Sequence, residues 1–158
     1  MLDKIKQTLT GQKKTKVFLD TNMLLLPGQR GVDVFTGIED VMMEPFEFCT
    51  VQAVFDELLS ISEGHTTRRR LFSFRGTKKS AKGADKQSAR LGIILAKQKD
   101  LKTLGRSSKR PSADEVLLDV VDSNSMVATL DRELQKKLRE KDIAVITLRQ
   151  NKLFTIIK

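Results

Sequence analysis

Short apolar runs alternate with segments of helical periodicity along this 158-residue chain. The apolar runs predict strands at 16–20, 46–50, 101–104, 126–130, 143–148 and 153–157. Helical spacing predicts helices near 2–9, 32–43, 51–62, 84–99 and 131–141, and another that begins at 112. Strands separated by helices predict an α/β three-layer sandwich with a central, mainly parallel sheet. The length suits one compact domain, so we expect residues 1–158 to form a single domain with a basic loop or insertion at about 64–83.

Positive charge gathers in the middle of the chain. The protein has 29 basic and 20 acidic residues, a formal net charge of +9. Residues 64–110 hold 15 of the basic residues and two of the acidic ones, a net of +13, which leaves 14 basic and 18 acidic residues, a net of −4, elsewhere. A concentrated cationic segment indicates a polyanionic partner, and nucleic acid is favoured over an acidic membrane.

Soft metal ligands are scarce in the sequence. The chain has one cysteine, Cys49, and one histidine, His65, which excludes an internal disulfide framework and a structural zinc site. The longest aliphatic run, 23–26, is far shorter than the ~20 residues of a membrane span. The N-terminal residues also lack the continuous apolar segment of a secretory signal. We therefore expect an intracellular protein without a membrane partner, located in the cytoplasm, or in the nucleolus if the source is eukaryotic.

Acidic residues recur near the ends of the predicted strands. Asp20 ends the first strand, Asp131 follows the fourth, and Asp114 lies in the first turn of the helix that begins at 112. Glu57 lies about two turns into the helix after the second strand. In parallel sheets functional residues gather beyond the carboxyl ends of the strands. Clustered carboxylates destabilise a fold unless a cation lies between them, and oxygen ligands favour Mg²⁺ or Mn²⁺.

Each of these residues also has a purely structural interpretation. Asp20 could cap a helix from an Asp-Thr-Asn turn, and Asp131 could be an N-cap. Asp114 could interact with a helix dipole, and Glu57 could be solvated. Taken singly, these interpretations are favoured. Four acids in a repeated α/β context favour a shared site instead.

The segments around the four acids resemble the motifs of PIN-domain ribonucleases. In chain order the segments are Val-Phe-Leu-Asp-Thr-Asn at 17–22, Asp-Glu-Leu-Leu at 56–59, Ser-Ala-Asp-Glu-Val-Leu at 112–117 and Val-Ala-Thr-Leu-Asp-Arg-Glu-Leu at 127–134. The ordered set spans residues 16–148, which is nearly the whole chain. The fourth segment and its extension to residue 148 are most similar to the small-subunit-processome PIN endonucleases, which cleave pre-ribosomal RNA, and to their archaeal counterparts.

The resemblance implies a metal-dependent endoribonuclease that cleaves RNA phosphodiester bonds, in ribosomal RNA processing and ribosome biogenesis. It implies four catalytic and Mg²⁺- or Mn²⁺-binding acids with two supporting side chains: Asp20, Glu57, Asp114 and Asp131, supported by Asn22 and Thr129. Glu115 or Asp119 could take the place of Asp114 as the third acid. Two alternatives remain, a VapC-type toxin ribonuclease and a non-catalytic RNA-binding scaffold with a PIN fold.

The basic segment is expected to hold RNA, such as pre-rRNA or structured RNA with unpaired segments, over the acidic site. The cations assigned to RNA binding are Arg68, Arg69, Arg70, Arg75, Lys78, Lys79 and Lys82. Phe72 and Phe74 could stack on unpaired bases or anchor the segment on the core. A homodimer is also considered, because many proteins of the resembled family dimerise.

Overall fold

The structure is a computed structural model that describes residues 13–64, 82–105 and 112–158. The helix predicted near 2–9 lies outside the described residues, and so does most of the predicted loop at 64–83. The remaining predictions can be compared with the fold directly.

Six strands form one sheet in the order β3-β2-β1-β4-β5-β6. The strands are β1 (Thr15–Leu19), β2 (Phe46–Val51), β3 (Lys102–Leu104), β4 (Ser125–Ala128), β5 (Ala144–Arg149) and β6 (Leu153–Ile157). The first five run parallel, and β6 pairs antiparallel with β5. The predicted mainly parallel sheet is confirmed.

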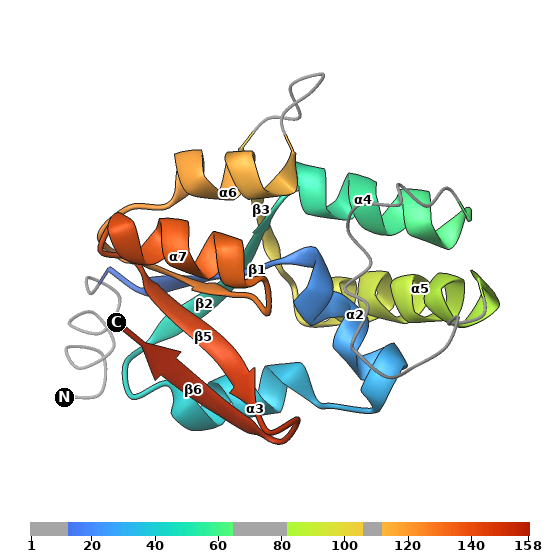
Figure 1. The fold of residues 1–158 in the computed structure, drawn as a ribbon, viewed down its shortest axis with the longest axis horizontal. Helices are drawn as coiled ribbons and strands as arrows, with labels where there is room; N and C mark the ends of the chain where they lie inside the picture. The colour runs from blue at the N-terminus through green and yellow to red at the C-terminus, as the bar shows by residue number, and fades with distance from the viewer. Residues whose placement is uncertain (1–12, 65–81, 106–111) are drawn as a thin grey trace, which may run out of the picture.

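Helices connect the parallel strands and cover both faces of the sheet. They are α2 (Thr21–Arg30), α3 (Val34–Val41), α4 (Gln52–Ser62), α5 (Lys82–Gln98), α6 (Ala113–Val120) and α7 (Arg132–Glu140). From β1 the chain moves along the sheet to β2 and β3, and then crosses back to β4 and continues to β5. Because crossovers between parallel strands are right-handed, connections that run in opposite directions along the sheet place their helices on opposite faces. In Figure 1, α6 and α7 lie above the strands and α3 lies below them. The three-layer α/β sandwich is therefore confirmed.

The central strand β1 is buried on both faces. Val17, Phe18 and Leu19 are fully buried between the two helical layers, as expected for a parallel strand with a continuous apolar sequence. The strand pairs with β2 on one side and with β4 on the other. Residues directly after β1 are therefore held at the middle of the sheet edge.

Helix α2 was not predicted from the sequence. The four apolar residues 23–26 are all buried, so the segment has no polar face and shows no helical period. Pro27 lies inside the helix, where a proline favours a break. The helix ends instead at Gly31, which has a left-handed φ of 64° and donates its N–H to the Pro27 carbonyl at 3.0 Å.

Helix α5 has its predicted position, but its large apolar residues do not form its buried face. Leu91 is 37% exposed and Ile94 52% exposed. The buried face instead carries small or polar residues, namely Asp85, Ser88, Ala89, Gly92 and Ala96. Small side chains occur there because α5 lies against α2 at very short range.

Among the residues that the structure describes, no helix is both long and apolar enough to cross a membrane.

Candidate active site

The sheet has a topological switch point between β1 and β4. The crossovers lead from β1 toward β2 on one side and from β4 toward β5 on the other, and in such sheets functional residues gather beyond the carboxyl ends of the strands at this reversal. Leu19 lies opposite Ala128 in the register, and the N–H of Asp20 donates to the Ala128 carbonyl at 3.1 Å. Asp20 and the residues after β4 therefore meet at this switch point.

The carboxylate of Asp20 is buried, and hydrogen bonds hold both of its oxygens. Only 4% of the residue is exposed. Its Oδ1 accepts from the Thr21 N–H at 2.8 Å, because Asp20 is the N-cap of α2. Its Oδ2 accepts from the Thr129 hydroxyl at 2.7 Å and from Asn22 Nδ2 at 3.0 Å. Asp20 therefore caps a helix, as the structural interpretation proposed, and also lies at the centre of a polar cluster.

Thr129 connects the two strand ends. Besides donating to Asp20, its Oγ1 accepts from Asn22 Nδ2 at 3.3 Å and from the Asp131 N–H at 3.1 Å. Asn22 completes the connection, because its Oδ1 accepts from the Leu130 N–H at 3.1 Å. Asn22 and Thr129, which the resemblance assigned as supporting residues, are thus in direct contact with Asp20.

Glu57 reaches the same region from α4. The Thr21 hydroxyl donates to its Oε2 at 2.6 Å. Glu57 is half-buried, so the interpretation of a fully solvated side chain does not hold. Thr21, the residue next to Asp20, therefore connects the carboxyl end of β1 to α4.

Electrostatic repulsion links Asp20 to two of the other predicted acids. The pKa of Asp20 is raised from 3.8 to about 7, first by burial and then by the nearby charges of Asp114 and Glu57, while hydrogen bonds from Thr129 and Thr21 lower it. Three acids from three different helices or helix ends therefore act on one another at this edge.

Of the three residues considered as the third acid, Asp114 is the one whose charge acts on Asp20. Glu115 is turned away, because its Oε2 accepts from the Ser112 N–H at 3.0 Å and the Ser112 Oγ accepts from the Glu115 N–H at 3.3 Å. These two bonds form a capping box at the start of α6, where the sequence predicted that a helix begins. Asp119 lies near the other end of α6 and is exposed. The charge that acts on Asp20 is that of Asp114.

Asp131 is the N-cap of α7. Its Oδ1 accepts from the N–H groups of Glu133 and Leu134, at 2.9 and 3.3 Å. The helix-capping interpretation therefore describes this side chain in the structure. Its backbone still belongs to the cluster, since its N–H donates to Thr129.

The described residues do not hold three acidic, cysteine or histidine side chains close enough to form a metal site as they stand. The chemistry of the donors nevertheless fits a hard divalent cation, because the side chains that meet here offer carboxylate, hydroxyl and amide oxygens. A cation would also relieve the repulsion that raises the pKa of Asp20.

Comparison with known proteins identifies the family. A family model described as a PIN like domain matches residues 73–151, half of the chain. The chain belongs to this family. The resemblance stated from the sequence motifs is therefore confirmed.

Two relatives show how the PIN-like chain compares along its length. It is 29% identical over 143 residues to Ribonuclease VapC4 of Methanocaldococcus jannaschii, covering 89% of this chain and 95% of the relative. It superposes on the structure of the PIN domain endonuclease Utp24 with a TM-score of 0.65 and 20% identity, covering 89% of this chain and 90% of the other. The second likeness shows a shared fold.

Most of the predicted RNA-binding cations lie outside the described residues of the PIN-like chain. They are Arg68, Arg69, Arg70, Arg75, Lys78 and Lys79, and Phe72, Phe74 and His65 lie there too. Lys82 begins α5, at the end of this segment. The assignment of these seven cations to RNA binding remains a prediction.

Two residues that contact the cluster were not predicted from the sequence. Thr21 was part of the first motif but was given no role, although it binds Glu57. Gln135 was not considered, although its Nε2 donates to the Thr129 carbonyl at 2.9 Å. Its partners, the Thr129 carbonyl and the Thr147 hydroxyl, depend on how α7 lies on the sheet, so no spacing in the sequence indicated them.

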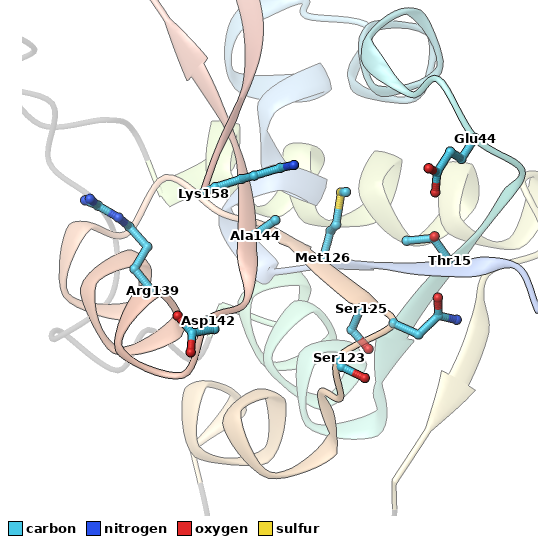
Figure 2. A pocket seen from close by; sticks show the side chains of 10 residues that line it. Thr15, Glu44, Ser123, Ser125, Met126, Arg139, Asp142, Ala144 and Lys158 are labelled. Atoms are coloured by element: carbon cyan, nitrogen blue, oxygen red, sulfur yellow. The ribbon is translucent and has the colours of Figure 1, made fainter.

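A pocket of about 330 Å³ lies at the amino ends of the parallel strands, opposite the carboxyl ends where this cluster lies. Figure 2 shows Thr15, Ser125 and Ala144, which begin their strands, together with Arg139 and Lys158 around it. None of its lining residues is one of the predicted site residues. The candidate active site is therefore the polar cluster at the carboxyl ends of β1 and β4, which is separate from this pocket.

Proposed function

We propose that this PIN-like chain is a divalent-cation-dependent endoribonuclease that hydrolyses RNA phosphodiester bonds. The observation that carries the proposal is the buried carboxylate of Asp20 at the topological switch point, with Asp114 and Glu57 acting on it. Carboxylates whose pKa is strongly raised by burial and neighbouring charge cluster at sites that bind a cation or carry out a reaction. The relative named Ribonuclease VapC4 supports the same activity.

The proposed ligands of Mg²⁺ or Mn²⁺ are Asp20, Glu57, Asp114 and Asp131. When bound, such a cation polarises the phosphoryl oxygens and lowers the pKa of a coordinated water. Asp131 would serve through the carboxylate oxygen that does not cap α7, since Oδ1 is used by the cap. Carboxylate ligands without histidine favour these two hard cations.

The protein's own residues hold the carboxylates in place. Thr129 and Asn22 direct donors at Oδ2 of Asp20, and the Thr21 N–H holds Oδ1. The Thr21 hydroxyl orients Glu57 in the same way. Because the pKa of Asp20 is raised to about 7, this group would have to release a proton in order to hold a cation at neutral pH and below.

We propose pre-ribosomal RNA, or structured RNA with unpaired segments, as the substrate, and ribosomal RNA processing in ribosome biogenesis as the role. The fold shared with the Utp24 PIN endonuclease and the cationic segment 64–110 support this role. The location that fits it is the cytoplasm, or the nucleolus in a eukaryote. Depletion of the protein is expected to cause unprocessed pre-rRNA to accumulate, as measured by RNA blotting.

A toxin ribonuclease is the second candidate role, and the 29% identity to VapC4 favours it. A toxin is expected to arrest growth when expressed alone, and the product of a neighbouring gene should relieve the arrest. Normal growth on expression together with pre-rRNA accumulation on depletion would support rRNA processing instead.

A non-catalytic scaffold is the third alternative. A ligand that binds only the folded state stabilises it by mass action. Mn²⁺ should therefore raise the melting temperature of a protein that has a metal site, and should leave that of a scaffold unchanged.

The homodimer remains a prediction. Exposed apolar side chains on the neighbouring helices α4 and α5, namely Leu59, Leu91 and Ile94, offer a candidate surface for it. Sedimentation of the wild type and of Ile94→Lys measures self-association, and the variant is expected to be more monomeric.

Cleavage of a single-stranded RNA by purified protein with Mn²⁺ tests the activity. Asp20→Asn is expected to lower the rate by roughly a thousandfold, because loss of a ligand charge removes several kcal/mol of transition-state stabilisation. The matched control is Asp33→Asn, since Asp33 also caps a helix, with Oδ1 accepting from the Thr36 N–H at 3.1 Å. Equal cleavage by wild type and Asp20→Asn would overturn the proposal.

A further inference from the structure

Gln135 lies near the start of α7, and its side-chain amide connects the end of β4 to β5. Its Nε2 donates to the Thr129 carbonyl at 2.9 Å and to the Thr147 hydroxyl at 3.1 Å. An amide nitrogen carries two protons, so both are used in these bonds. Gln135 is half-buried, and Thr147 is buried on β5.

Hydrogen bonds hold both the backbone N–H and the backbone carbonyl of Thr129. Its N–H donates to the Ile146 carbonyl at 3.0 Å, which continues the contact between β4 and β5 by one residue. Its carbonyl lies beyond the last residue of β4, Ala128, and accepts from Gln135. The orientation of the Thr129 peptide thus depends on α7 as well as on the sheet.

The orientation of Thr129 determines the rest of the cluster. Its hydroxyl donates to Asp20 Oδ2 at 2.7 Å and accepts from the Asp131 N–H at 3.1 Å. A rotation of the Thr129 peptide would change both contacts together. Small displacements matter at such a site, because a shift of about 1 Å can lower a rate by roughly a hundredfold.

We propose that Gln135 is a positioning residue that sets the orientation of Thr129, and through it that of Asp20, in the active site. The inference rests on the proposed endoribonuclease function. Gln135 lies one helical turn from the capping residue Asp131, so it couples the start of α7 to the ends of two strands. Its role is to fix the shape of the site, without contact to the substrate.

Three variants test the proposal. Gln135→Met keeps the length of the side chain and removes both hydrogen bonds. Gln135→Lys restores a donor on a chain of similar length, so it is expected to recover activity that the methionine variant loses. Gln98→Met, at the exposed end of α5, makes the same substitution away from the cluster.

For Gln135→Met we expect kcat to fall by about ten- to a hundredfold while KM changes by less than about twofold, since only the reacting geometry is disturbed. Gln135→Lys should lie between the methionine variant and the wild type, and Gln98→Met should match the wild type. Unchanged kcat in Gln135→Met, or no recovery in Gln135→Lys, would overturn the inference. A wild type that does not cleave RNA would instead overturn the proposed function.

Amide hydrogen exchange gives a measurement that does not depend on activity. The N–H groups of Leu130 and Asp131 donate to Asn22 and Thr129, so both should exchange faster in Gln135→Met, with exchange in the rest of β4 and β5 unchanged. Faster exchange throughout β4 and β5 would mean that Gln135 serves general stability, which contradicts a positioning role.

Discussion

Asp20 combines burial with nearby negative charge, and both make its ionised form unfavourable in the folded protein. Its pKa rises from 3.8 to about 7, although Thr129 and Thr21 donate hydrogen bonds to it. Desolvation is the largest cause. The ionised site is therefore a source of instability when no cation is bound.

This shift predicts how stability changes with pH in metal-free buffer. Between about pH 4 and 7 the unfolded state has released the Asp20 proton while the folded state retains it, so the free energy of unfolding falls as pH rises. The loss is at most about 4 kcal/mol and is complete near pH 7. Urea denaturation at several pH values in EDTA should show wild type losing stability relative to Asp20→Asn over this range. Parallel curves would contradict the assigned pKa.

Thr129 provides a second prediction for a single residue. Thr129→Val removes the hydroxyl that donates to Asp20 while keeping the shape of the side chain. A hydrogen bond to a charged group is worth roughly 1.5–3 kcal/mol, so we expect kcat to fall by roughly ten- to a hundredfold. Thr129→Ser keeps the donor and should stay close to wild type. A serine variant as slow as the valine variant would show that the methyl group matters more than the hydroxyl.

The core of the cluster was predictable from the sequence, but its supporting contacts were not. Asp20, Asn22 and Thr129 belong to two motifs at strand ends, and parallel strands bring such ends together. Thr21 and Gln135 donate to atoms that a single sequence cannot locate, because their partners depend on how helices settle on the sheet. For Asp131 the sequence left a metal ligand and an N-cap as alternatives, and the structure shows that its Oδ1 caps α7.

Helices α2 and α5 approach so closely that glycine is required between them. A Cβ on Gly92 would lie 2.4 Å from the Leu24 carbonyl oxygen, which belongs to the backbone of α2 and cannot rotate away. Since Asp20 caps α2, this contact also fixes the helix that carries part of the site.

Gly92→Ala is therefore expected to destabilise the fold by about 1–3 kcal/mol through overpacking. The control is Gly83→Ala on the same helix, where a Cβ would meet no atom within 4 Å. That variant should be neutral or more stable by up to about 1 kcal/mol, because alanine has the higher helix propensity. Urea denaturation measures both, and similar stabilities for the two variants would contradict the close packing of α2 and α5.

This contact also explains why the large apolar residues of α5 are not its buried face. Leu91 and Ile94 are exposed, because a helix this close to its neighbour buries small residues instead. In α3, by contrast, the apolar residues Val34, Phe35 and Ile38 at helical spacing are the buried ones.

Charge is unevenly divided over the whole molecule. The net of +13 on residues 64–110 and −4 on the rest separates a cationic segment from the acids of the site. Such a division allows RNA to be held near carboxylates that would otherwise repel it.

Neutralising Arg68, Arg69 and Arg70 with glutamine is expected to weaken RNA binding. The dependence of log K on log salt concentration should become shallower by up to about 0.7 for each lost phosphate contact on single strands. Neutralising Lys14, Arg139 and Lys158 is the matched control, because these cations lie at or near the starts of the parallel strands, away from the cluster. Titrations at several salt concentrations measure both, and equal slopes for the two triple variants would argue against a role specific to residues 68–70.

The position of β4 in the sheet has a consequence for the timing of synthesis. Residues 125–128 pair with β1, which was made more than 100 residues earlier, and only that pairing brings Thr129 to Asp20. A growing chain that already contains Asp20, Glu57 and Asp114 therefore has no assembled site until α7 has left the ribosome. A nuclease built in this way stays inactive for most of its own translation, while it is surrounded by the RNA of the machine that makes it.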